Sequence, residues 1–169
     1  MKKFELTAEF VTNVFGKKLF RIKALVAFGN VEKGELGGFI EKEENLSNNG
    51  SAWVSGDARV CGNARVSGDA QVSGNAWVYD NAQVSGDAQV SGNADYAVVA
   101  GFGRYFRTTT FFRCKDKILR VQCGCFYGDL AQFREIVKKT HGDSKYAKEY
   151  LAIADLMELH FSDECGGEK

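Results

Sequence analysis

Proline is absent from this sequence of 169 residues, and histidine occurs only as His141 and His160. Without proline, the chain keeps every backbone N–H that a β-ladder can use, so the absence favours a protein rich in strands. Histidine is the side chain that enzymes use most often as a general base, and neither histidine here has a nucleophile at a fixed spacing. These shortages favour a strand-rich protein without a catalytic role.

Net charge and long apolar segments are also lacking. The 22 Lys and Arg residues balance the 22 Asp and Glu residues, which gives no overall attraction to nucleic acid or to an anionic membrane. No apolar run is long enough to span a bilayer, and no secretory signal is recognisable. The five cysteines are odd in number and lack the spacing of a disulfide framework. We therefore expect a cytoplasmic protein with no cofactor and no membrane contact.

A six-residue repeat occupies positions 51–96. Its successive units are SAWVSG, DARVCG, NARVSG, DAQVSG, NAWVYD, NAQVSG, DAQVSG and NADYAV. Each Ala-x-Val triplet places a small and a branched side chain on one face of a short strand, because residues two apart share a face. The Ser-Gly-Asp/Asn segments between the triplets are typical of turns. A fixed period of this kind predicts a solenoid with an apolar interior, in which Ala94 and Tyr96 end the two series.

The hexads resemble the repeats of left-handed β-helix proteins. In that family three hexads form one triangular coil, so the resemblance implies that residues 18 apart stack on each other. It implies a fold that is mainly β, with a short left-handed parallel β-helix of two to three coils. A right-handed β-helix is the alternative, because periodicity does not determine handedness. Ile40, Leu46 and Ala52 keep the six-residue step, so the first coil is expected to begin near Phe39.

The flanking segments are expected to cap the two apolar ends of the solenoid. Strands are predicted at residues 4–6 and 18–28, and a second hairpin at 105–114 and 118–126. Apolar residues at helical spacing predict one helix between Asp129 and Gly142 and another after Ser144. The predicted organisation is listed in chain order: an N-terminal β cap (1–45), the β-helix (46–97), a small α+β module of hairpin and two helices (98–162) and a flexible tail (163–169).

Some outward positions of the predicted coil carry side chains typical of binding surfaces. With three hexads per coil, Asp95 stacks below Arg59 and Trp77, while Gln71 and Gln89 stack below Trp53. Tyr79 follows on the corner beside Trp77. Trp, Tyr and Arg are the residues enriched at the energetic centres of interfaces. We expect Arg59, Trp77, Tyr79 and Trp53 to bind a partner or a second copy of the chain; alternatively, flanking segments of the same chain cover them.

Two further sets could bind small ligands. Arg104, Arg107, Thr109 and Arg113 follow a Gly-Phe-Gly segment and could hold an anion such as a nucleotide phosphate. The alternative, which the missing P-loop ending favours, is a glycine hinge followed by a Thr-rich strand. The three cysteines at positions 114, 123 and 125 have matching strand parity on the predicted hairpin. With a histidine they would make a tetrahedral metal site, and buried thiols are the alternative. The proposed metal ligands are Cys114, Cys123, Cys125 and His141.

Three segments resemble uncharacterised hexapeptide-repeat proteins of phages, prophages and bacteria: residues 18–25, residues 36–47 and residues 123–126. The resemblance implies a β-helix and a mobile-element origin, and it implies no catalytic residues. The predicted function is a non-catalytic protein that binds a bacterial partner, such as a component of host anti-phage defence, and that forms homo-oligomers. The alternatives are a sponge for a phosphorylated small molecule or nucleotide, nucleic-acid binding by the basic hairpin, and a hexapeptide-repeat acyltransferase.

Overall fold

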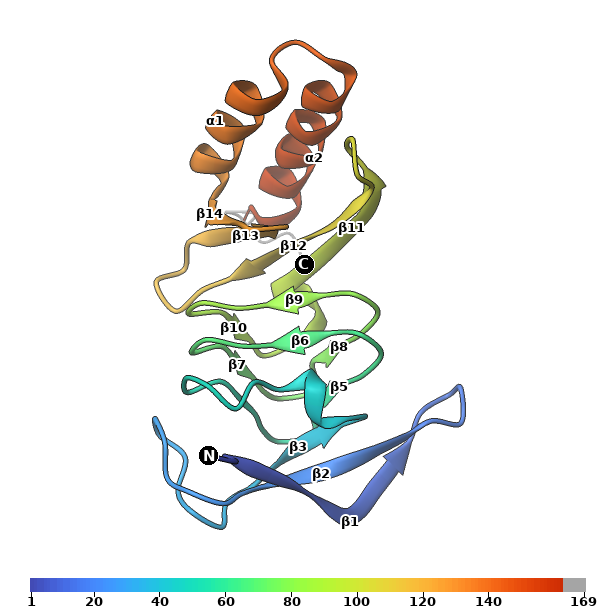
Figure 1. Cartoon of the computed structure of the whole chain (residues 1–169), viewed down its shortest axis with the longest axis vertical. Helices are drawn as coiled ribbons and strands as arrows, with labels where there is room; N and C mark the ends of the chain where they lie inside the picture. Colours follow the sequence, from blue (N-terminus) through green and yellow to red (C-terminus); the bar gives the residue numbers. More distant parts are fainter. Residues whose placement is uncertain (163–169) are drawn as a thin grey trace, which may run out of the picture.

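The computed structural model describes residues 1–162 and is elongated, with a stack of short strands between two antiparallel sheets (Figure 1). The predicted tail at 163–169 lies outside the described residues. Before the stack come β1 (Phe4–Thr12), β2 (Lys18–Ala24), β3 (Leu36–Ile40) and the short 3-10 helix η1 (Glu43–Asn45). The stack itself consists of two-residue strands: β4 (Trp53–Val54), β5 (Arg59–Val60), β6 (Arg65–Val66), β7 (Gln71–Val72), β8 (Trp77–Val78), β9 (Gln83–Val84) and β10 (Gln89–Val90).

The stacked strands form a β-solenoid, as the repeat predicts. Parallel pairs join residues 18 positions apart, for example Arg59 with Trp77 and Arg65 with Gln83. Three sides result, because β4, β7 and β10 form one sheet, β5 and β8 continue from β3, and β6 pairs with β9. Three six-residue units therefore complete one coil. All seven valines from Val54 to Val90 and all seven alanines from Ala52 to Ala88 in the two repeat phases are fully buried.

The beginning and the end of the solenoid differ from the prediction. Ile40 pairs with Val60 and Leu46 pairs with Val66, so both occupy valine positions of the first coil. The next valine position of the coil is taken by Val54 and not by Ala52 as predicted. The reason is that the corner after Leu46 is two residues longer than the other corners. At the other end Ala94 is exposed, since the 3-10 helix η2 (Asn93–Asp95) interrupts the repeat; Asp95 consequently does not stack below Trp77.

The first coil is closed by side chains that bind its free carbonyl groups. The ammonium group of Lys3 donates to the carbonyl oxygens of Gly50 (3.3 Å) and Ala52 (2.8 Å). The Nδ2 group of Asn45 donates to the carbonyl oxygens of Gly62 (3.1 Å) and Ala64 (2.8 Å). These carbonyls lie at the end of the stack, where no further coil can supply an N–H donor. Buried carbonyl groups are costly when unpaired, so both side chains stabilise the open end.

Stability should depend on pH through Lys3, which is almost fully buried. Burial lowers the pKa of its ammonium group from 10.5 to about 8, although Asp69 nearby favours the charged form. Between pH 8 and 10.5 the unfolded chain then binds more protons than the folded chain, so the Lys3 contribution becomes more favourable as pH rises. We expect the free energy of unfolding of the wild type, relative to Lys3→Met, to rise by about 2 kcal/mol between pH 7.5 and 9.5.

Urea titrations at several pH values would test this prediction. The difference between wild type and Lys3→Met cancels the titrations of Cys61, Cys114 and Tyr96, whose pKa values burial raises. Lys2→Met is the matched control, because Lys2 is exposed and pairs with Glu43 on the surface (2.6 Å). If the free energy of unfolding of the wild type and that of Lys3→Met change with pH in parallel, the expected burial of the Lys3 ammonium group is contradicted.

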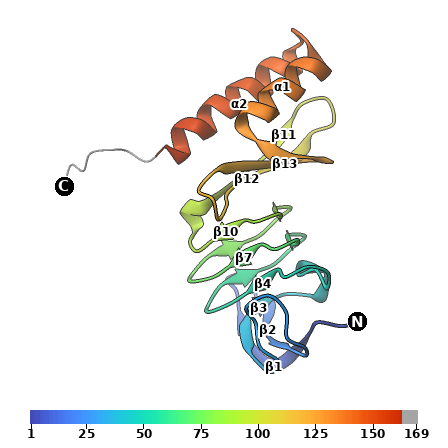
Figure 2. The same cartoon turned by 90° about the vertical axis from the view of Figure 1, so that its left-hand side faces the viewer.

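The chain continues beyond the solenoid in a four-stranded antiparallel sheet and two helices. The elements are β11 (Tyr96–Phe102), β12 (Arg107–Arg113), β13 (Leu119–Cys123), β14 (Phe126–Asp129), α1 (Leu130–His141) and α2 (Lys145–Phe161). One face of the sheet packs on the last coil through Phe112, and the other packs on the helices through Phe111 and Val121. Figure 2 shows the sheet between the solenoid and the helices. Both predicted helices are confirmed, with Asp129 and Ser144 as N-caps.

Three strand predictions need correction. β11 was not predicted, and it pairs with β12 along Tyr96–Val99; the Gly-Phe-Gly segment lies at the turn between these two strands. Phe126 begins β14 rather than ending a hairpin arm, because the chain turns again at Gly124, whose φ is +58°. At the N-terminus β1 is longer than predicted and extends to Thr12, whereas β2 is shorter than predicted and ends at Ala24. No helix within residues 1–162 combines the length and the apolar character needed to cross a membrane.

Candidate binding groove on the solenoid

One side of the solenoid carries the aromatic pair predicted from the repeat. Trp77 on β8 and Tyr79 on the following corner have ring centroids 5.8 Å apart. The Trp77 indole N–H donates to the sulfur of Cys61 (3.4 Å), which lies one coil away. Trp77 is therefore held half-buried, whereas Tyr79 is 49% exposed. Arg59 on β5 pairs with Trp77 in the sheet and is also half-buried.

The tip of the β1–β2 hairpin lies beside this pair. Val14 and Phe15 at the tip are 82% and 81% exposed. The buried Asn13 holds the tip in place, since its Oδ1 accepts hydrogen bonds from the backbone N–H groups of Phe15 and Lys17, both at 3.0 Å. Its backbone oxygen also accepts from Gly16 (3.0 Å). The hairpin thus presents two apolar side chains to solvent in a defined conformation.

Two hollows adjoin each other on this side of the solenoid. A pocket of about 450 Å³ is lined by the hairpin tip, Trp77 and Tyr79. A second hollow of about 380 Å³ shares Tyr79, Asp80 and Asn93 with it and extends to Val98 on β11. We call the two together the aromatic groove.

The polar groups in the floor of the groove are bound to each other. Lys17 and Glu41 form an ion pair of 3.0 Å, and the other Glu41 oxygen accepts the backbone N–H of Gly62 at 2.6 Å. That backbone hydrogen bond, together with Lys17, lowers the pKa of the Glu41 carboxyl group. Burial raises the pKa of the Cys61 thiol, so this sulfur stays protonated at neutral pH and is a poor nucleophile. This chemistry suits binding rather than proton transfer or covalent catalysis.

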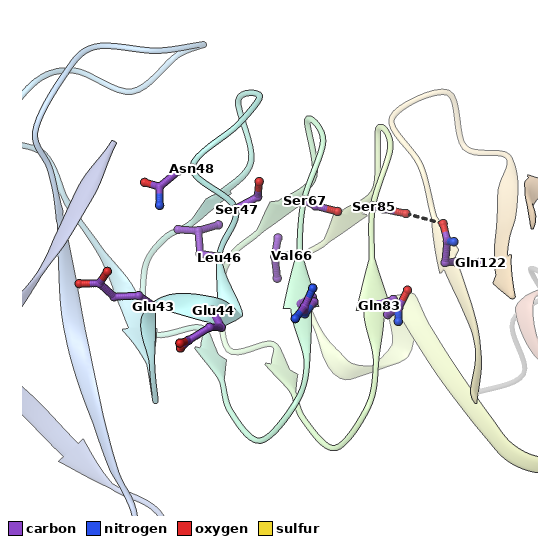
Figure 3. A pocket seen from close by; sticks show the side chains of 11 residues that line it. Glu43, Glu44, Leu46, Ser47, Asn48, Val66, Ser67, Gln83, Ser85 and Gln122 are labelled. Atoms are coloured by element: carbon purple, nitrogen blue, oxygen red, sulfur yellow. Dashed lines mark hydrogen bonds between the residues drawn. The ribbon is translucent and has the colours of Figure 1, made fainter. Parts of the chain in front are cut away.

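A wider hollow lies on another side of the solenoid, the one formed by β6 and β9 (Figure 3). Its volume is about 580 Å³. Glu43 and Glu44 of η1 border one end, and at the other end the Ser85 hydroxyl donates to Oε1 of Gln122 (3.0 Å). Arg65 and Gln83 lie on the strands between them. The lining is polar and open, and it lacks the aromatic side chains that anchor protein partners.

Trp53 does not belong to an exposed surface, contrary to the prediction. It is 2% exposed, because the segment between β2 and β3 folds over it and places Phe28 edge-on against its ring at 5.4 Å. The alternative considered for the outward aromatics, coverage by the same chain, therefore applies to Trp53. Trp53 is therefore part of the buried core and is not available to a partner.

The predicted anion site does not form as one site. Thr109 is buried, and its hydroxyl donates to the sulfur of Cys123 (3.2 Å). Arg113 lies toward α2, where it donates to the carbonyl oxygen of Phe161 (3.2 Å), and it is 3.7 Å from Asp95. Of the four residues, Arg104 and Arg107 stay together: Arg104 lies on the turn between β11 and β12, and Arg107 is the first residue of β12. Arg107, Thr109 and Arg113 share the side of β12 that faces the helices, because residues two apart in a strand share a face. The site does not form because Thr109 is buried there and Arg113 lies at the opposite end of the strand from Arg107.

The predicted metal site also does not form. Cys123 pairs with Thr109, which faces the helices, whereas Cys114 faces the solenoid core with Phe112. The prediction assumed that the three cysteines lie on the same face of the hairpin. The observed pairing of β12 with β13 instead places Cys114 on the opposite face of the sheet from Cys123. Cys123, Cys125 and His141 line a pocket near the helices. Throughout residues 1–162, no three His, Cys, Asp or Glu side chains are close enough to hold a metal ion.

Comparison with known families agrees with the geometry of the stack. Residues 58–74 and 70–86 match the family model described as the YdcK Beta solenoid repeat. This part of the chain is a beta solenoid. The two matches overlap and together run from Ala58, just before β5, to the corner after β9, so they include both strands that carry Arg59 and Trp77. No curated protein matches the chain.

The hairpin tip is the part of the groove that sequence reasoning missed. The chain turns at residues 14–16 between β1 and β2, and the exposed Val14 and Phe15 received no functional interpretation. Turns usually carry polar residues and glycine. Two adjacent apolar residues in the segment between the two predicted strands were therefore the signal that could have revealed this contact surface.

Proposed function

We propose that this chain is a non-catalytic binding protein whose aromatic groove docks a bacterial protein. The observation that carries the proposal is the pair Val14 and Phe15, each about four-fifths exposed and held rigid by Asn13 beside Tyr79. Leaving apolar side chains in water costs free energy, and a rigid tip loses little conformational entropy when it binds. Exposed patches of this kind on soluble proteins commonly mark protein-binding sites.

The nature of the partner is inferred from a resemblance in sequence. The resemblance of residues 18–25, 36–47 and 123–126 to phage and prophage proteins favours a bacterial protein in the cytoplasm, with components of anti-phage defence as the first candidates. The same resemblance supports left-handed winding of the solenoid. The sheets at its two ends support a capping role for residues 1–45 and 98–162.

The proposal is tested by capture from a nuclease-treated bacterial lysate with four immobilised proteins. These are the wild type, Phe15→Ser, Tyr79→Ala and Leu159→Ser. Leu159 is the matched control because it is an equally exposed apolar residue (71%) on α2, outside the groove. We expect one specific protein to bind the wild type and Leu159→Ser, and to bind the two groove variants at least about tenfold more weakly, the typical loss at an interface hot spot.

Other outcomes identify the alternatives. If no lysate protein is retained and sedimentation shows a wild-type oligomer that Phe15→Ser dissociates, the groove joins copies of this chain and the partner proposal is wrong. Retention that disappears with nuclease treatment would instead indicate nucleic-acid binding by the basic hairpin. Thermal stabilisation by acyl-CoA, lost in His141→Ala, would favour the acyltransferase alternative.

A further inference from the structure

A second pocket lies in the C-terminal part of the chain, away from the aromatic groove. It has a volume of about 210 Å³, opens to solvent on one side and is lined by residues of the β11–β12 turn, the β13–β14 turn and both helices. Most of its wall is apolar. The apolar and aromatic residues of the wall are Phe126, Phe133, Ile136, Val137 and Tyr150. Phe133 is the central residue, since its ring packs against those of Phe126 (5.6 Å) and Tyr150 (5.8 Å).

The rim of this pocket is cationic. The guanidinium groups of Arg104 and Arg107 lie over the ring of Tyr105, at 5.5 Å and 5.1 Å from its centroid. Within residues 1–162 neither arginine forms an ion pair with a carboxylate. The first acidic residue of α2 is Glu149. Its carboxylate accepts a hydrogen bond from the backbone N–H of Gly103 (2.8 Å) and lies 3.8 Å from the ammonium group of Lys145. Two positive charges therefore stand unneutralised at the mouth of an apolar cavity.

The turn that carries the arginines is attached to α2. In addition to the Gly103–Glu149 hydrogen bond, the Tyr150 hydroxyl donates to the carbonyl oxygen of Phe102 (3.4 Å). Burial raises the pKa of Tyr150 to about 12, so this hydroxyl keeps its proton at neutral pH. The turn is thus positioned against the pocket before any ligand arrives, which reduces the entropy cost of binding.

We propose that this pocket binds a small carboxylate that carries an apolar ring or a short aliphatic chain. The carboxylate would pair with Arg104 and Arg107, since guanidinium groups bind carboxylates through paired, charge-assisted hydrogen bonds. The ring or chain would fill the space against Phe133. A nucleotide base fits less well, because its polar edge would meet mainly apolar side chains and lose hydrogen bonds to water. This site is independent of the aromatic groove.

The test is a titration of the ¹⁵N-labelled full chain with benzoate and with hexanoate, followed by amide chemical shifts. Benzyl alcohol and hexanol serve as uncharged probes of similar shape, and AMP serves as a nucleotide probe. The variants are Arg104→Gln/Arg107→Gln and, as a control, Arg65→Gln, which removes an exposed arginine of the solenoid. Thermal melting of each variant establishes that it is folded.

We expect saturable shifts at residues 104–107, 123–126 and 133–141 with at least one carboxylate. The double variant should bind at least about tenfold more weakly, and Arg65→Gln should bind like the wild type. Three results would overturn the proposal. The first is the absence of a saturable shift up to about 20 mM carboxylate, because a ligand of this size that fits the pocket should bind more tightly than that. The others are equal affinity for the carboxylates and the uncharged probes, and tighter binding of AMP than of either carboxylate.

Discussion

Replacing Val72 by aspartate should prevent the chain from folding. Val72 lies on β7, the middle strand of its sheet between β4 and β10, and its side chain is fully buried among the other valines and alanines of the coil. An aspartate there would place a charge in an apolar interior with no partner. The expected cost is about 5 kcal/mol or more, which is comparable to the whole stability of a typical domain.

Circular dichroism and urea denaturation would measure this effect. Gln89→Asp is the matched control, because Gln89 lies on the neighbouring strand β10 but is exposed. The control should lose less than about 0.5 kcal/mol, as is usual for a surface position. A Val72→Asp protein with wild-type stability would show that the valine series is not the interior of the solenoid.

Replacing Gly74 by alanine should destabilise the chain by about 3 kcal/mol. Gly74 occupies a corner of the coil with φ of +61°, a left-handed conformation that costs an alanine about 1 kcal/mol or more. A Cβ atom at this position would also collide with the backbone carbonyl oxygen of Ser91 in the next coil. Because the obstacle is backbone, relief requires the two coils to move apart.

Gly92 provides the control for this experiment, because it occupies the same position of the repeat one coil later. Its φ is −158°, and a Cβ atom there would meet nothing within 4 Å. Gly92→Ala should therefore melt within about 1–2 °C of the wild type, whereas Gly74→Ala should melt several degrees lower. Equal melting temperatures for the two variants would show that the corners do not require glycine.

The repeat made the interior of the solenoid predictable, and it made the direction of each outward side chain predictable as well. It did not reveal which outward side chains reach solvent. Trp53 and Trp77 occupy equivalent places in their hexads, yet Phe28 covers Trp53 while Trp77 lines an open groove. The covering segment comes from residues outside the repeat, and no local pattern specifies where such a segment will pack.

The cysteine prediction failed for a related reason. Parity along one strand is a local property, and the sequence shows it directly. The pairing between two strands depends on the turn that joins them, and a shift of one residue moves a side chain to the other face of the sheet. The observed register places Cys123 opposite Thr109 and separates it from Cys114, so the expected ligands never meet.

The sequence by itself determined the solenoid and the two C-terminal helices, whereas the three units per coil were implied by the family resemblance and are seen in the strand pairing. These features depend on interactions between residues that are close in sequence or related by a constant period, so a single chain displays them. Only the tertiary structure decided the coverage of Trp53, the position of Phe15 beside Tyr79 and the enclosure of a pocket below Arg104 and Arg107. Each of these depends on packing between segments far apart in the chain, where burial of apolar surface selects one arrangement and leaves no periodic signal.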